Sequence, residues 1–253
     1  MKKHILLAVA VCSAFILKAG DKDLASHGGG GDSKLTIGVS VGAALPMGAY
    51  GDKKADTADK IADSATIQHG YASTGFHFDV NAGYLIGGPV GVMVLIGGNM
   101  NSYDVATYET VNNRHPVSGE TFAVKSYYVG QYLVGPFLAL PAGDKLKINI
   151  RLLVGLVTAS YPTSTITDGS FTDVTTASNA SAFGYHFSAG IKYNFSDKLG
   201  LAVDLGYTGS SLTYSGYTDT QTAGSNTTTS TSGHKGTMAL GLLTASVGIA
   251  FNL

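Results

Sequence analysis

The chain has 253 residues, of which 13% are charged and 44% are hydrophobic, and its formal net charge is −1. This composition excludes a disordered chain, which needs low hydrophobicity, and a nucleic-acid-binding protein, which needs a basic surface. The 34 glycines disfavour a helical protein, because each glycine inside a helix costs about 1 kcal/mol. An all-β protein with many turns fits the composition.

The first 20 residues have the pattern of a secretory signal peptide. Lys2 and Lys3 precede an apolar stretch over 5–17 that is too short to cross a bilayer, and Ala19 is a small residue suited to cleavage. The single cysteine, Cys12, lies inside that stretch, so we expect no disulfide and no thiolate metal site in the mature chain. Residues 21–34 contain four consecutive glycines and are expected to form a flexible lead-in.

From residue 35 onward, apolar residues alternate with small or polar ones, which is the period of a β-strand with two different faces. Eight segments show it: 35–45, 76–84, 90–96, 128–138, 146–156, 183–195, 199–207 and 245–253. Short turns at 87–89, 141–144 and 196–198 alternate with long polar segments at 48–73, 102–123, 162–181 and 212–236. This alternation predicts an antiparallel, up-and-down transmembrane β-barrel over 35–253, with both of its ends on the short-turn, periplasmic side.

The last segment has one irregularity. Met238, Leu240 and Leu242 are apolar but stand in the opposite phase to the strand that follows them. A β-bulge inserts one residue and restores the phase, so we expect a bulge near 242–244.

The chemistry of the two strand faces favours a membrane barrel over a soluble one. One face is large, aliphatic and aromatic, whereas the other carries glycine, serine, asparagine and few charges, too few for a surface in water. An apolar band facing lipid, with small residues inside, is typical of outer-membrane barrels. Tyrosines are expected at the membrane interfaces, with this set at the loop end: Tyr71, Tyr103, Tyr161, Tyr207 and Tyr214.

With this pattern, residues 35–253 resemble the small eight-stranded outer-membrane proteins of Gram-negative bacteria, similar to the OmpA transmembrane domain and OmpX. The resemblance rests on the strand pattern, on residues 132–136 (YLVGP) before a short turn, and on the C-terminal strand. That strand looks like the family's assembly signal through Val247, Ile249, Phe251 and Leu253, although many such signals end in an aromatic residue. The resemblance implies contact with outer-membrane lipids and insertion by the barrel-assembly machinery, but no single activity.

The inward face is predicted to carry a charge network. Charges inside a narrow barrel are expected to pair with one another, because burying an unpaired charge is costly. The turn at 196–198 places Asp204 opposite position 190 and therefore predicts Lys192 as its diagonal partner. We interpret the network as structural, with a gated ion path as the alternative, and assign to it Asp79, Lys147, Arg151, His186, Lys192 and Asp204, with His77 nearby.

One short motif invites a catalytic interpretation. His186 and Ser188 stand two apart on one strand face, which looks like the His-x-Ser of the outer-membrane lipid A deacylase family. Ala189 stands where that family favours asparagine, no glutamate follows at the family's spacing, and both side chains are predicted to face the lumen. The sequence offers no metal cluster, no cofactor motif and no paired catalytic carboxylates, so we expect neither a metal nor a cofactor.

The sequence therefore favours a monomeric, non-enzymatic outer-membrane barrel with a structural or surface-interaction role. Its long loops, above all 218–232, are rich in threonine, serine and asparagine, and loops on a rigid scaffold are where ligands such as host-surface molecules are usually bound. Two alternatives stay open: a narrow channel for small solutes or ions, and a lipid A-modifying enzyme.

Overall fold

The computed structural model describes residues 34–55, 64–114 and 116–253. The predicted signal peptide, and the predicted lead-in up to residue 33, lie outside these described residues. The described residues form a single sheet of 12 strands with a short α-helix and a 3-10 turn. Neither helical element has the length and hydropathy that a membrane crossing requires.

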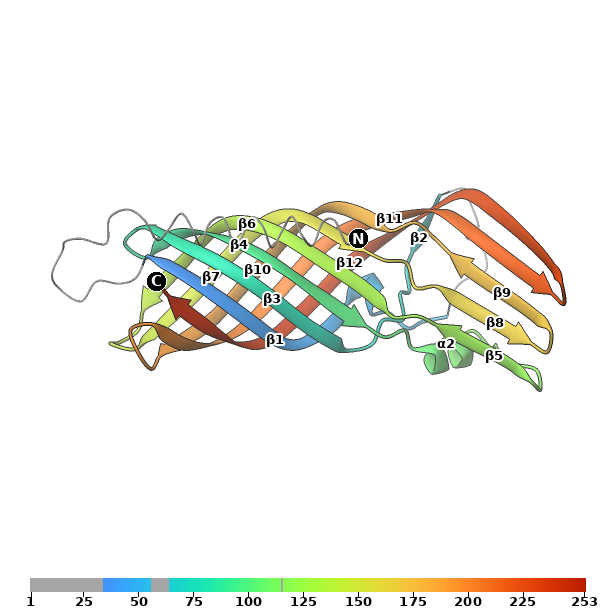
Figure 1. Ribbon diagram of the computed structural model, residues 1–253, viewed down its shortest axis with the longest axis horizontal. Coiled ribbons are helices and arrows are strands. Elements are labelled where there is room, and N and C mark those ends of the chain that lie inside the picture. The colour runs from blue at the N-terminus through green and yellow to red at the C-terminus, as the bar shows by residue number, and fades with distance from the viewer. Residues whose placement is uncertain (1–33, 56–63, 115) are drawn as a thin grey trace. The chain divides into compact units, whose positions relative to one another are not determined.

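Eight of the strands close into a ring, in which each strand is antiparallel to both neighbours (Figure 1). In ring order these strands are β1 (Leu35–Met47), β3 (Gly75–Gly87), β4 (Val90–Asn101), β6 (Tyr127–Pro141), β7 (Leu146–Ala159), β10 (Ala180–Asn194), β11 (Leu199–Ala223) and β12 (Asn226–Asn252). The predicted eight-stranded antiparallel barrel is therefore confirmed. Every strand of the ring is longer than the roughly 9–11 residues with which a tilted strand spans a bilayer.

The barrel closes between its first and last strands. Residues 241–252 of β12 pair with β1, with Val41 opposite Val247. At the short-turn end, Leu253 N donates to Leu35 O at 2.8 Å and Leu35 N donates to Leu253 O at 3.3 Å. Closure leaves no open edge facing lipid, where each unpaired backbone group would cost several kcal/mol.

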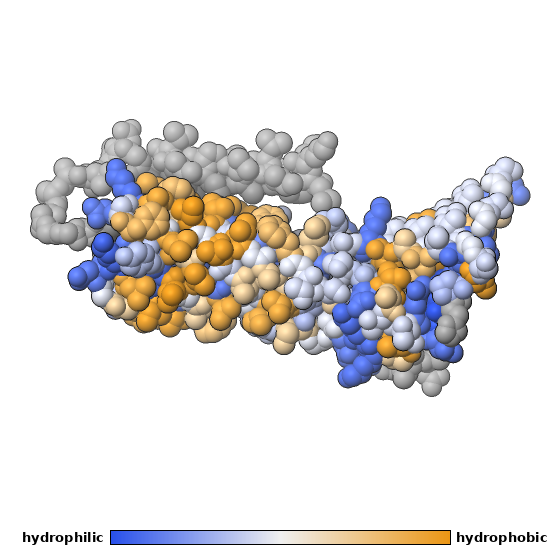
Figure 2. All heavy atoms as spheres, turned by 90° about the horizontal axis from the view of Figure 1, so that it is seen from below, coloured by the Kyte–Doolittle hydropathy of each residue, from blue (hydrophilic) through white to orange (hydrophobic). Residues whose placement is uncertain are grey.

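The outward face is apolar and the inward face is small or polar, as predicted. Val247, Ile249 and Phe251 are each 46% exposed and Leu253 is 57% exposed, so the predicted assembly-signal residues all face outward. On the inward face, Ser40 and Asp79 are each 4% exposed. Figure 2 shows apolar residues gathered over the barrel wall between two zones of hydrophilic residues.

The bulge predicted near 242–244 is wrong. β12 keeps one continuous register there against both β1 and β11, and the irregularity in its pairing with β11 lies between Ser215 and Tyr217. Met238, Leu240 and Leu242 point inward and are almost fully buried. The strand does not change phase. Instead, the inward-facing residues of β12 change from small or polar over 244–252 to apolar at Leu242, Leu240 and Met238.

The long polar segments are more ordered than the sequence suggests. The predicted loop 212–236 is a hairpin, in which β11 and β12 continue to a two-residue turn at Gly224 and Ser225. Threonine favours strands, and glycine readily adopts the positive φ of 59° found at Gly224. The sheet extends beyond the ring through β9 (Phe171–Thr176), β8 (Ser164–Asp168) and β5 (Glu120–Val124), while β2 (Ser64–Ile67) pairs with β12 (Figure 1).

Candidate functional site

The first group of charges in the lumen is an ion pair between Arg151 of β7 and Asp204 of β11. Arg151 Nη2 lies 3.2 Å from Oδ1 and 3.3 Å from Oδ2 of Asp204, and both residues are buried. The predicted pairing of Lys192 with Asp204 is wrong, because Lys192 Nζ donates instead to Asn252 Oδ1 at 2.9 Å. Asp204 does face Gly190, as predicted. A side chain at that position would collide with the Asp204 carboxylate, so the glycine leaves room for the carboxylate to lie over β10 toward β7.

The second group surrounds Asp79 of β3. Asn81 Nδ2 donates to Asp79 Oδ1 at 2.8 Å, and His77 Nε2 lies 3.1 Å from Asp79 Oδ2. His77 Nδ1 lies 2.8 Å from Asn99 Oδ1 on the neighbouring strand β4. The two predicted lumen carboxylates thus take part in two separate hydrogen-bonded groups. The sequence did not single out the amides Asn81 and Asn99.

His186 belongs to a hydrogen-bonded chain across the lumen. Its Nδ1 lies 2.9 Å from Thr208 Oγ1, and Thr208 Oγ1 donates to Gln131 Oε1 at 3.2 Å. The hydroxyl of Ser188 is buried and has no hydrogen-bond partner among the described residues. His186 and Ser188 therefore lack the hydrogen bond that a nucleophile and its base share.

The loop-end half of the lumen is filled by apolar and aromatic side chains. They come from β4, β6, β7, β11 and β12 and from the 3-10 turn η1 (Gly48–Tyr50), and include Tyr50, Leu95, Tyr127, Leu133, Leu153, Val157, Leu212, Tyr214, Met238, Leu240 and Leu242. We call this set the loop-end core. Its side chains are almost fully buried inside the barrel.

The tyrosines predicted at the loop-end interface have different surroundings. Tyr103 and Tyr161 pack partly buried against the loop-end core, whereas Tyr207 lies next to Tyr185 on the outward face, as predicted. Tyr71 and Tyr214 are each 1% exposed, so their assignment to the membrane interface is wrong. The hydroxyl of Tyr71 donates to the backbone carbonyl of Lys54. A buried tyrosine hydroxyl usually finds such a partner, and here the contact ties the segment after β1 to the segment before β3.

A polar contact fixes the helix α2 (Val105–Val111) to the segment after η1. Asp104 caps the helix, because Thr107 N donates to Asp104 Oδ1 at 3.0 Å. Lys53 Nζ donates to Asp104 Oδ2 at 2.8 Å. These two hydrogen bonds, the one from Lys53 first, hold the pKa of the Asp104 carboxyl below its usual range.

The strands beyond the ring present a face made almost entirely of threonine. Across β11 and β12, hydroxyls of directly opposite threonines lie 3.2 to 3.5 Å apart in the pairs Thr218–Thr231, Thr220–Thr229 and Thr222–Thr227. Directly opposite residues of antiparallel strands share a face, and the registers continue this face across β9, β8 and β5. We call it the threonine face, whose further members are Thr172, Val174, Thr176, Thr165, Thr167, Thr121 and Ala123.

The opposite face of the same sheet has a different chemistry. It carries Asp219 and Gln221 of β11, Asp173 of β9 and Glu120 of β5. No member of the threonine face is charged. The sequence analysis identified residues 218–232 as a polar loop. It did not predict the threonine face, because the strands that pair to form this face come from three separate parts of the chain.

The closed ring, the apolar outer band and the charge pairs inside define a small outer-membrane β-barrel. Solved structures of such barrels are similar to this chain. Neisserial surface protein A (NspA) is 12% identical with a TM-score of 0.43, over 88% of this chain and 99% of that one. Ail, the attachment invasion locus protein of Yersinia pestis, is 10% identical with a TM-score of 0.40, over 87% and 100%.

The outer membrane protease OmpT from Escherichia coli is 11% identical with a TM-score of 0.46, over 72% of this chain and 65% of that one. No family model and no curated protein matches the chain. At these identities the likenesses concern the fold alone.

Proposed function

We propose that this protein is a non-enzymatic outer-membrane barrel that meets surfaces outside the cell through its threonine face. The single observation that carries the proposal is this face, an ordered and uncharged array of hydroxyl and methyl groups built on strands that continue out of the barrel wall. A rigid sheet loses little conformational entropy when it binds, which favours affinity.

The chemistry of the face favours an uncharged, hydroxyl-rich partner, such as a neutral polysaccharide. Threonine hydroxyls both donate and accept hydrogen bonds, which suits sugar hydroxyls. Because the face has no lysine or arginine, it offers nothing to pair with the sulfate groups of an anionic polysaccharide.

Binding of purified barrel in lipid vesicles to an immobilised neutral polysaccharide tests the proposal. Thr227→Lys and Thr229→Lys place a charge on the exposed edge of the face, and each is expected to weaken binding about ten-fold, equivalent to about 1.4 kcal/mol. A sulfated polysaccharide should not bind the unmodified protein.

Thr228→Lys is the matched control, because Thr228 lies on the same exposed strand but belongs to the opposite face. It should bind like the unmodified protein. Equal loss of binding in Thr228→Lys and Thr229→Lys, or no binding of the unmodified protein, would contradict the proposal. Fast migration on an unheated SDS gel reports that each variant is folded.

A further inference from the structure

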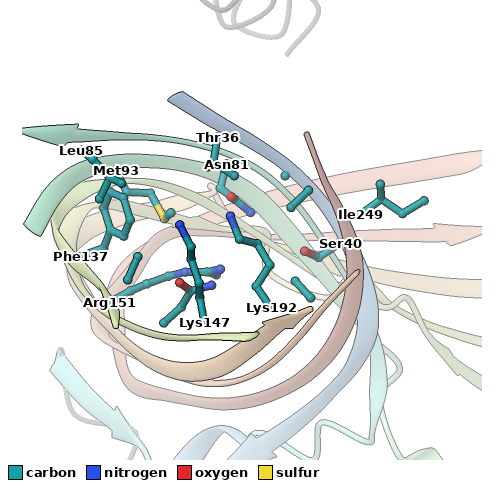
Figure 3. A pocket seen from close by; sticks show the side chains of 15 residues that line it. Thr36, Ser40, Asn81, Leu85, Met93, Phe137, Lys147, Arg151, Lys192 and Ile249 are labelled. Atoms are coloured by element: carbon teal, nitrogen blue, oxygen red, sulfur yellow. The ribbon is translucent and has the colours of Figure 1, made fainter. Parts of the chain in front are cut away.

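The short-turn mouth of the barrel holds a pocket with two unlike walls. One wall carries Lys147 and Arg151 of β7 and Lys192 of β10, and the other carries Leu85, Met93 and Phe137. Figure 3 shows the side-chain amines of Lys147 and Lys192 directed toward the same part of the lumen. None of the residues that line the pocket is Asp or Glu.

The cationic wall brings like charges close together. Lys192 of β10 is directly opposite Lys147 of β7 in the strand register, and like charges at directly opposite positions destabilise a sheet. Lys192 is 6% exposed and its Nζ is held by Asn252 Oδ1 at 2.9 Å. An anion between the two ammonium groups would make an attractive contact with each of them.

Arg151 adds a third cation. It is 5% exposed and engages Asp204 through Nη2, while its buried Nε has no hydrogen-bond partner among the described residues. Asp79, the other lumen carboxylate of the predicted network, is engaged by His77 and Asn81. The lumen network thus contains three cationic side chains, Lys147, Arg151 and Lys192, and two carboxylates.

We propose that this pocket binds a compact oxyanion of the size of phosphate, held by Lys147, Lys192 and Arg151. Charge-assisted hydrogen bonds from lysine and arginine suit phosphate oxygens. The apolar wall of Leu85, Met93 and Phe137 supplies no competing acceptor. Because the buried side chains of the loop-end core lie in the lumen on the other side of the pocket, the anion enters and leaves by the short-turn mouth, and the pocket is a blind binding site.

The test measures thermal unfolding of the full-length barrel in an uncharged detergent, with phosphate replacing chloride at constant ionic strength. Phosphate should raise the unfolding midpoint, because a ligand that binds the folded state stabilises it. Lys147→Gln and Lys192→Gln should each weaken phosphate binding about ten-fold, the lower end of what a hydrogen bond to a charged group contributes. The double variant should lose the shift.

Lys198→Gln is the matched control, because Lys198 is exposed in a short turn at the same end and does not line the pocket. It should keep the shift. Loss of the shift in Lys198→Gln, its persistence in the folded double variant, or its absence from the unmodified protein would overturn the proposal. Heat-modifiable migration reports folding of every variant.

A second arm separates a soluble oxyanion from a lipid headgroup. Inorganic phosphate and phosphatidic acid, added in mixed micelles, present the same phosphate chemistry. A lysine-dependent shift with phosphatidic acid alone assigns the site to a headgroup, and one with inorganic phosphate assigns it to a soluble ion. A lysine-independent shift with either probe counts against the pocket.

Discussion

The ion pair of Arg151 with Asp204 makes a prediction at the scale of single residues. Arg151→Met leaves a buried carboxylate without its partner, so we expect it to lower the free energy of unfolding in lipid vesicles by about 3 kcal/mol. Asp204→Asn should also destabilise the barrel. Combined, the two substitutions should cost less than the sum of the single ones, as measured by urea unfolding.

The control is a second double-mutant cycle, which combines Lys192→Met with Asp204→Asn. The side chain of Lys192 donates a hydrogen bond to Asn252. The coupling energy of this second cycle should therefore be the smaller of the two. Strict additivity of the Arg151 and Asp204 substitutions would show that the ion pair does not stabilise the folded barrel.

Two adjacent leucines of β7 test the loop-end core. Leu153 is 0% exposed inside the core, whereas Leu152 is 54% exposed on the outer face. Both lose the same isopropyl group on substitution by alanine. Leu153→Ala also leaves a cavity, so we expect a cost of about 3–5 kcal/mol.

Leu152→Ala should cost only about 2 kcal/mol, the contribution of the lost apolar groups, because fluid lipid fills the space. Urea unfolding in vesicles measures both variants. Equal costs would mean that the core is loosely packed and that the lumen is open at the loop end.

The sequence predicted which side chains enter the lumen but not which of them meet. Alternation along a strand fixes the face of Arg151, Asp204 and Lys192, because successive side chains point to opposite sides. The partner depends on contacts across a strand. Arg151 of β7 and Asp204 of β11 are separated by β10 in the ring, and it is the missing side chain of Gly190 that allows the contact.

At the scale of elements, β12 closes the barrel and ends in the predicted assembly signal. Phe251 is opposite Ile37 of β1 and Leu199 of β11, and it faces outward. Phe251→Asp places a charge on the lipid face of the closing strand, which costs more the deeper it lies. We expect this change, or removal of residues 251–253, to abolish insertion into the outer membrane.

The readout is the amount of protein in the outer membrane that migrates faster on an unheated SDS gel. Phe251→Leu keeps an apolar side chain and is the matched control, expected to insert normally. Normal insertion of the truncated chain would show that closure and recognition do not depend on these residues.

The extension of β11 and β12 shows where element-level reasoning fails. Residues 218–232 lack the apolar alternation that identifies a strand half buried in a core. They form strands because threonine tolerates the extended backbone and because β9 pairs with residues 218–223 of β11. That partner is about fifty residues away, so no local pattern predicts it.

At the scale of the whole molecule, the barrel has two chemically different ends. The short turns and the two ends of the ring lie together, next to the cationic pocket. The other end carries the apolar loop-end core and the sheet beyond it. The sequence predicted this polarity from connection lengths alone, because a strand pair joined by a short turn leaves its long connections at the opposite end.

The orientation in the membrane follows from that polarity and can be tested by labelling lysines. Lys54 lies at the loop end with 79% of its side chain exposed, whereas Lys145 and Lys198 are exposed in short turns. Periplasmic turns of outer-membrane barrels are short and extracellular loops are longer. A membrane-impermeant amine reagent on intact cells should therefore label Lys54 and leave Lys145 and Lys198 unlabelled, as read by peptide mass. Permeabilised cells are the control, because all three lysines should react in them. Labelling of Lys198 in intact cells would show that the orientation is the opposite one.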